Sequence, residues 1–150
     1  MNQELIEQRK AGLDQFIAES HPVIVDFAER LEHPNASAVL TDNTEMSYLL
    51  GMIGEFMKDE LVDEETHNWI TARIGYTLGE YFIQKYNGYW EVNKNPESPQ
   101  YGHYVIFAIS PRNEQKAYPI DTFEAAHEYV SQEPERDLIS LIEEIEGMLV

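Results

Sequence analysis

The chain contains no cysteine, and this absence alone removes several functions. It can form no disulfide framework, bind no zinc through thiolates and use no cysteine nucleophile. No apolar run approaches the ~20 residues that a membrane-spanning helix needs. Residues 1–5 show neither the basic nor the apolar part of a secretory signal. We therefore expect a soluble protein of the cytoplasm.

Basic residues are scarce, because Lys and Arg number 10 against 28 Asp and Glu, and the net charge is −18. A surface this acidic repels DNA, RNA and anionic lipid, so we expect neither a nucleic-acid nor a membrane partner. Catalytic signatures are missing too: no serine stands in a Gly-x-Ser-x-Gly turn, and no glycine-rich phosphate loop follows a strand. We expect no cofactor.

The acidic residues that are present are not spread evenly. Residues 1–65 hold 15 acidic against 4 basic side chains, residues 121–150 hold 9 against 1, and residues 66–120 hold 4 against 5. Two acidic flanks thus enclose a neutral middle that contains seven of the nine tyrosines. Either a cationic partner or simple solubility accounts for such a charge.

The length and the 43% apolar content predict one domain, residues 1–150, with a single core. Apolar spacing predicts four helices in the first half, over about residues 5–21, 22–31, 42–61 and 63–86. Pro22 separates the first two, and Asp42 and Asp63 are the predicted N-caps of the others. Gly88 is the predicted left-handed residue after the fourth helix.

The apolar period then changes to that of strands. Alternation predicts strands over residues 89–92, 103–109 and 115–118, and the second is apolar on both faces and therefore central. Two further helices are predicted to begin at Asp121 and at Pro134. The fold class is thus α+β, with a helical N-terminal half, a small antiparallel sheet of about three strands and two C-terminal helices.

The acidic flanks supply most of the candidate partner-binding residues. If the two flanks are adjacent in space, they form one acidic cleft; if they lie on opposite sides, the charge serves only solvation. A tyrosine in the proline-containing loop is added as an exposed anchor, because tyrosine is enriched at interface hot spots. The predicted contact residues for a basic protein are Glu55, Asp59, Glu60, Asp63, Glu64, Tyr101, Glu143 and Glu144.

Two Glu-x-x-His spacings, Glu64–His67 and Glu124–His127, are the best candidates for metal ligands. Residues three apart share a helix face, and paired motifs of this kind build di-iron sites in helical bundles. Both glutamates, however, lie in first helical turns, where the helix dipole favours an acidic residue even without a metal. We therefore predict solvated helix starts rather than a metal site.

Gly75 and Gly79 lie one turn apart on the predicted fourth helix, and each costs about 1 kcal/mol of helix propensity. Two such residues on one face indicate that something bulky approaches the helix closely. Tight packing between helix and sheet is the favoured interpretation, and a ligand groove is the alternative.

The segment around these glycines has the pattern of a glycine, two residues and Leu-Gly-Glu, followed by a glycine and a tryptophan: Gly75, Leu78, Gly79, Glu80, Gly88 and Trp90. It resembles small bacterial domains of unknown function, some of which resemble immunity proteins that neutralise toxins delivered between competing bacteria. The resemblance covers only residues 75–92 and implies a helix that runs into a strand.

Our leading hypothesis is a non-enzymatic, acidic protein-binding domain of the immunity type, which neutralises a cationic bacterial toxin. One alternative is a small hydrolase or metal-dependent enzyme that uses the Glu64/His67 region or a groove at Gly75 and Gly79. The other is a homo-oligomer with the tyrosine-rich middle as its dimer face, in which the charge serves only solubility.

Overall fold

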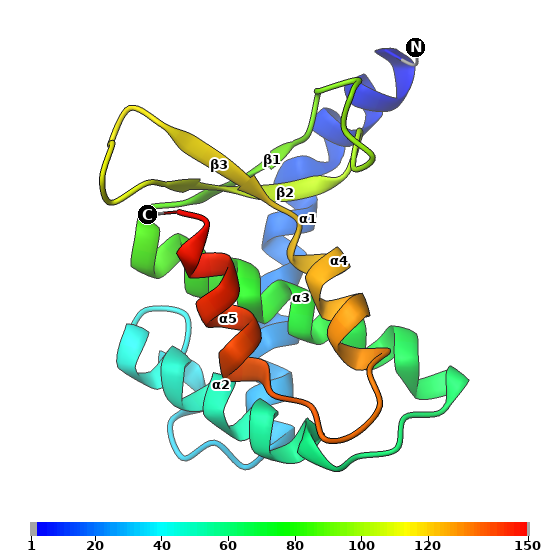
Figure 1. Ribbon diagram of the computed structural model, residues 1–150, viewed down its shortest axis with the longest axis vertical. Coiled ribbons are helices and arrows are strands. Elements are labelled where there is room, and N and C mark those ends of the chain that lie inside the picture. Colours follow the sequence, from blue (N-terminus) through cyan, green and yellow to red (C-terminus); the bar gives the residue numbers. More distant parts are fainter. Residues whose placement is uncertain (1–2, 150) are drawn as a thin grey trace.

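The computed structural model describes residues 3–149, with a small sheet at one end and helices at the other (Figure 1). The helices are α1 (Gln3–Arg30), α2 (Asn43–Lys58), α3 (Glu64–Tyr86), α4 (Thr122–Val130) and α5 (Leu138–Gly147), with a 3₁₀ turn η1 (Ala36–Ala38). The strands are β1 (Tyr89–Val92), β2 (Tyr104–Ile109) and β3 (Ala117–Ile120). This is the predicted α+β architecture. None of the helices within the described range is long and apolar enough to cross a lipid bilayer.

α1 is one helix rather than the two that were predicted. Pro22 lies inside it and has no N–H to donate to the carbonyl four residues earlier. The helix continues because apolar side chains on both sides of the proline pack into the same interior. Phe16 packs there before Pro22, and Ile24 and Phe27 are buried after it. Tertiary packing outweighs the roughly 3 kcal/mol that an interior proline costs.

α2 begins as predicted, because the Asp42 carboxylate accepts a hydrogen bond from the Thr44 N–H (2.9 Å). The predicted extension of its apolar stripe to Leu61 is wrong. The helix ends at Lys58 and Leu61 is 84% exposed. The helix ends where Arg136 donates hydrogen bonds to the carbonyls of Met57 and Lys58. The buried stripe is Met46, Leu49, Leu50, Ile53 and Met57.

α3 is the central helix and contacts α1, α2, α4 and β2. Asp63 caps its start as predicted, by accepting from the Thr66 N–H (2.8 Å). The left-handed residue at its end is Asn87 (φ 51°) and not Gly88. Asparagine tolerates this conformation because its short polar side chain bonds locally.

The sheet is an antiparallel meander of order β1-β2-β3, with β2 central as predicted. Trp90 lies opposite Ile106, which in turn lies opposite Ile120. β3 begins two residues later than predicted, because the Lys116 N–H bonds back to the Asn113 carbonyl in the preceding turn (2.9 Å).

The two C-terminal helices start at aspartate caps. Asp121 accepts from the Glu124 N–H at the start of α4 (2.9 Å), as predicted. α5 begins at Leu138 and not at Pro134, with Asp137 as its cap. Before the cap the chain runs along the end of α2, where the Arg136 N–H donates to the Lys58 carbonyl (3.1 Å).

Candidate functional site

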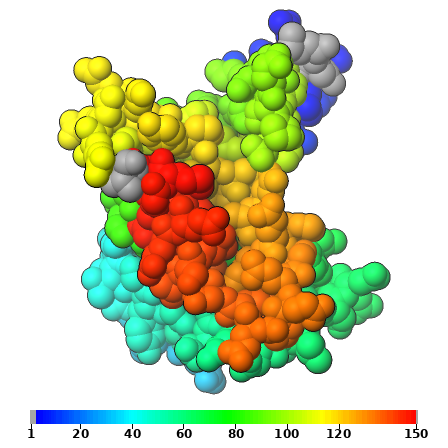
Figure 2. Space-filling view, viewed as in Figure 1, coloured from blue at the N-terminus to red at the C-terminus, as the bar shows by residue number. Residues whose placement is uncertain are grey.

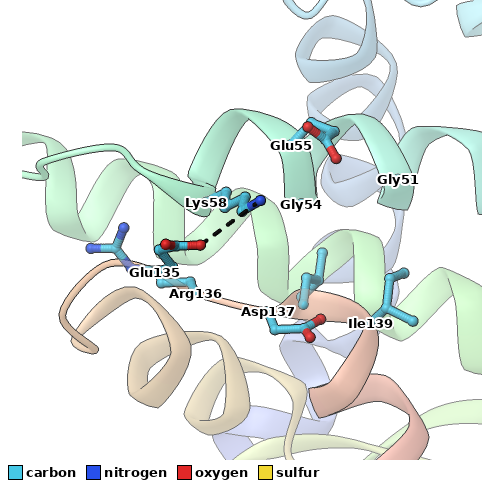
Figure 3. A pocket seen from close by; sticks show the side chains of 9 residues that line it. Gly51, Gly54, Glu55, Lys58, Glu135, Arg136, Asp137 and Ile139 are labelled. Atoms are coloured by element: carbon cyan, nitrogen blue, oxygen red, sulfur yellow. Dashed lines mark ion pairs between the residues drawn. The ribbon is translucent and has the colours of Figure 1, made fainter.

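The two acidic flanks of the sequence lie side by side in space. α5 and the segment before it pack against α2, and Figure 2 shows α5 (red) lying against the cyan and teal surface of the first flank. A hollow of about 560 Å³ lies between them (Figure 3). Glu55 and Lys58 of α2 line one side, and Glu135 and Asp137 line the other. The two flanks therefore share one surface.

The charge that this hollow presents is mainly negative. Lys58 Nζ lies 3.8 Å from Glu135 Oε2, but both side chains are exposed, and such pairs contribute little to stability. Asp137 accepts from the backbone N–H and the hydroxyl of Ser140 (3.0 and 2.8 Å). These hydrogen bonds hold the pKa of Asp137 below its ordinary value, so it stays ionised.

Arg136, the remaining cation beside the hollow, does not face solvent, because it is only 5% exposed. Its Nη1 donates to the carbonyls of Met57 (2.9 Å) and Glu60 (2.7 Å), and its Nη2 to that of Val130 (3.2 Å). These acceptors lie at or near the C-terminal ends of α2 and α4, where carbonyls lack helical partners and the dipole favours a cation. Arg136 thus fixes the shape of the hollow from inside.

A second hollow of about 600 Å³ lies across α2, and its lining is largely apolar. The two hollows share Gly51 and Glu55, so we call the combined surface the α2 groove. Tyr48 and Phe56, two turns apart on α2, are 55% and 45% exposed. Clustered exposed aromatic side chains are typical of interaction sites. The second hollow is lined by Leu31, Tyr48, Gly51, Met52, Glu55 and Phe56.

Gly51 lies in both hollows of the α2 groove, and a Cβ there would meet no described atom within 4 Å other than its chain neighbours and the backbone of its own helix. A glycine inside a helix costs about 1 kcal/mol relative to alanine. No packing within the described chain requires it. Such a bare spot on a helix allows a second backbone to approach closely.

The structure separates the predicted contact residues of the first flank by position. Glu55 lines the α2 groove, and Asp59 and Glu60 are exposed just beyond the end of α2. Asp63 and Glu64 lie at the start of α3, beside the imidazole of His67. The Thr66 N–H lowers the pKa of Asp63, whose carboxylate serves as the cap.

The other three predicted contact residues lie outside the groove. Glu143 and Glu144 are exposed on α5, more than a turn beyond Asp137. Tyr101 is half-buried rather than exposed. Its loop lies beside the N-terminal part of α1, at the opposite end of the molecule from α2 (Figure 1). The exposed aromatic residues at the α2 groove are instead Tyr48 and Phe56, which lie outside the neutral middle.

Several tyrosines of the neutral middle serve the interior. Tyr81 and Tyr86 donate to one carboxylate oxygen of Glu146 (3.0 and 2.6 Å), and Lys85 Nζ lies 2.6 Å from the same atom. Burial, and then the Glu146 carboxylate, raise the pKa of Tyr86 to about 12. This network fastens α5 to the end of α3.

The paired Glu-x-x-His motifs bring their histidines together but not their glutamates. The rings of His67 and His127 lie 5.0 Å apart. His67 lies beside His127, and Gly75, further along α3, lies beside Phe123 at the start of α4, so the two helices run in opposite directions. Glu64 and Glu124 therefore extend from the histidine pair in opposite directions, and Glu124 accepts a hydrogen bond from Gln100 (2.6 Å). Among residues 3–149 no three His, Asp or Glu side chains converge as metal ligands.

Packing explains both glycines of α3, but the predicted packing between helix and sheet holds only for Gly79, because the neighbour of Gly75 lies on α4. A Cβ on Gly75 would overlap the Phe123 ring, and one on Gly79 would overlap Trp90. Phe123 and Trp90 therefore fill the space that the alternative interpretation left for a ligand.

Next to Gly79, the Glu80 carboxyl is 6% exposed and lies 3.2 Å from Nε2 of His21. Burial raises the pKa of Glu80, and His21 offsets part of that rise. The pair joins α1 to α3, with the Glu80 side chain buried and the His21 side chain 44% exposed.

Comparison with known proteins adds no relative: no family model matches the chain, and no curated protein or solved structure matches it significantly.

Proposed function

We propose that the chain is a non-enzymatic, acidic protein-binding domain whose α2 groove binds a basic protein. The observation that carries the proposal is the meeting of the two acidic flanks beside an exposed apolar strip. Glu55 belongs to both hollows of the groove, and Tyr48 and Phe56 lie on its apolar side.

The two halves of the groove supply different parts of binding. Clustered carboxylates accelerate association with a cationic protein and exclude acidic competitors. Aromatic side chains that become buried on contact supply most of the affinity. Gly51 lets the partner's backbone come close to α2. Nucleic acid and anionic membranes are excluded as partners by charge.

Within this class, the biological role that we propose is that of an immunity protein, which neutralises a cationic toxin in the cytoplasm by covering its basic site. The resemblance of residues 75–92 to immunity-like bacterial domains supports this role, and so does the acidic groove. The first candidate partner to assay is the product of the adjacent gene.

The test compares three forms of the protein in binding to that candidate. The groove variant Tyr48→Ser/Phe56→Ser should bind at least tenfold more weakly than the wild type, because it loses two anchor side chains. The matched control is Tyr89→Ser/Tyr118→Ser, which removes two exposed tyrosines of the sheet and should bind normally. Wild-type affinity should fall steeply as salt increases.

Equal binding by the groove variant and the control would place the interface elsewhere, and salt-independent binding would contradict the electrostatic part of the proposal. Sedimentation of the protein alone tests the homo-oligomer alternative. A dimer that dissociates when Tyr48 and Phe56 are replaced would show that the α2 groove binds a second copy instead of a basic protein.

A further inference from the structure

A second candidate site shares no lining residue with the α2 groove. It is a hollow of about 260 Å³ where α1, α3, β2 and α4 meet. Four of its lining side chains are aromatic: Phe16, Tyr76, Tyr104 and Phe123. Phe16 lies 4.3 Å from Tyr104 and 5.4 Å from Tyr76 between ring centroids. Walls made of flat rings favour a flat ring as the ligand, because aromatic rings attract one another in offset and edge-on arrangements.

One of these walls is held in place by the backbone. The Tyr104 hydroxyl donates to the Arg9 carbonyl (2.7 Å), which ties β2 to α1. Phe123 is likewise fixed, because its ring lies against Gly75. The hollow is therefore formed by anchored side chains and needs little rearrangement to accept a ligand.

A histidine–aspartate pair lies at this hollow. His103 Nδ1 is 2.6 Å from Asp121 Oδ2, and the Asp121 side chain is only 6% exposed. The other oxygen of Asp121 accepts from the Glu124 N–H. An ionised carboxylate only accepts hydrogen bonds, so Nδ1 carries the proton in this pair. Nε2 of the half-exposed imidazole is left for a ligand. It accepts a hydrogen bond when the ring is neutral, and it donates one to a carboxylate only when a second proton makes the ring an imidazolium.

Arg9 adds a permanent positive charge at the same place. Its guanidinium lies 6.0 Å from the centroid of the Tyr104 ring, and no carboxylate within residues 3–149 forms an ion pair with it. Arg9 is the one permanently charged cation among the residues that line the hollow. The carboxylate of Asp121 is already engaged by His103 and by the cap of α4. The hollow therefore favours an anion.

We propose that this hollow binds a small aromatic carboxylate, with the ring between Phe16, Tyr76 and Phe123 and the carboxylate toward Arg9 and the imidazolium form of His103. The hollow is smaller than the roughly 300–1,000 Å³ of sites for drug-sized ligands, so the ligand has about ten non-hydrogen atoms. A ligand of that size binds with a dissociation constant of about 1 mM.

The test is an NMR titration of the full chain with three probes of similar size. Phenylacetate has both the ring and the charge, cyclohexylacetate keeps the charge without the aromatic ring, and phenethylamine keeps the ring with the opposite charge. Phenylacetate should give saturable shifts at residues that line this hollow. The other two should bind at least tenfold more weakly, because each lacks one matched feature.

Two exposed substitutions assign the polar contacts. Arg9→Gln and His103→Gln should each weaken phenylacetate binding at least fivefold, while the neighbouring Lys10→Gln should leave it unchanged. No saturable shift up to about 10 mM phenylacetate would overturn the proposal. So would equal binding of cyclohexylacetate or phenethylamine, shifts confined to the α2 groove, or unchanged affinity in both Arg9→Gln and His103→Gln.

Discussion

Two helices of this protein carry a pair of glycines on one face, and the two faces are used differently. On α3, Gly75 and Gly79 receive the rings of Phe123 and Trp90. On α2, Gly54 faces Leu138, but Gly51 faces open space. Helical glycine costs about 1 kcal/mol in either place. Packing within the chain offsets that cost on α3, whereas nothing in the described chain offsets it at Gly51.

The contrast between α3 and α2 distinguishes a glycine that makes room for the chain's own side chains from one that leaves room for a binding partner. Where the chain's own side chains pack against a helical glycine, the structure shows the contact directly. A close approach made by a partner leaves a glycine without a neighbour beside exposed apolar side chains, as the partly exposed Gly51 lies beside Tyr48 and Phe56. The two faces therefore respond in opposite ways to an added methyl group.

The largest effect is expected for Gly79→Ala, which should lower the free energy of unfolding by about 2–3 kcal/mol, because the new Cβ overlaps Trp90. Urea denaturation measures the change. Trp90→Phe in the same chain should recover part of the loss, since a smaller ring leaves room, and a double-mutant cycle gives the coupling. Unchanged stability in Gly79→Ala would refute the packing account of the α3 face.

A smaller loss is expected for Arg136→Met, which tests the support beneath the α2 groove. The substitution keeps much of the apolar stem but leaves the carbonyls of Met57, Glu60 and Val130 without their donor. We expect a loss of about 2 kcal/mol. Arg112→Met, at an exposed arginine in the β2–β3 turn, is the control and should change stability by less than about 0.5 kcal/mol.

Gly51→Ala should have the opposite sign. The methyl group meets nothing within 4 Å, so only helix propensity changes, and stability should rise by about 0.5–1 kcal/mol. The same denaturation series measures it beside Gly79→Ala. Gly51→Leu should fold normally yet weaken binding of the basic partner, because its side chain fills the groove. Normal binding by Gly51→Leu would show that the partner does not approach α2 there.

The smallest effect concerns pH. Burial raises the pKa of Glu80 above 4.5 in the folded protein, so the folded state binds this proton more tightly than the unfolded state does. The stabilisation is complete below pH 4.5 and is lost as the pH rises through the higher folded value. Glu80→Gln should therefore gain stability relative to the wild type as the pH rises above 4.5 and through the higher folded pKa of Glu80.

The control for this pH series is Glu55→Gln, which removes a carboxyl from the exposed side of α2. Over the same rise in pH, Glu80→Gln should gain more stability relative to the wild type than Glu55→Gln does. Parallel curves for Glu80→Gln and the wild type would contradict the assigned role of Glu80.

Helix starts that depend on neighbouring residues could be predicted from the sequence. Helix ends and starts that depend on residues far away in the sequence could not. Asp42, Asp63 and Asp121 act as caps because each bonds to an N–H two or three residues away. The end of α2 and the start of α5 depend on Arg136, which lies far from α2 in the sequence. The continuity of α1 through Pro22 likewise depends on packing against other elements.

The candidate site was predictable in part. The acidic composition of the first flank was enough to predict Glu55 as a contact residue. That the two acidic flanks are adjacent could be seen only in the folded structure. Tyr48, Met52 and Phe56 repeat every four residues beside the buried stripe of α2. The argument from the cost of a glycine inside a helix, which singled out Gly75 and Gly79, applies equally to Gly51. Together with this second apolar stripe, it could have predicted the groove from the sequence. The hollow at His103 was not, because its residues come from four separate elements.

The burial of Arg136 also makes the end of α2 observable by proteolysis. Trypsin must take an arginine side chain into its specificity pocket before it cuts. In the folded chain that side chain is inside, bonded to carbonyls near the ends of two helices. Cleavage after Arg136 therefore requires these helices to separate locally. The rate of that one cut, compared with cleavage at exposed Arg112, reports how often the floor of the groove opens.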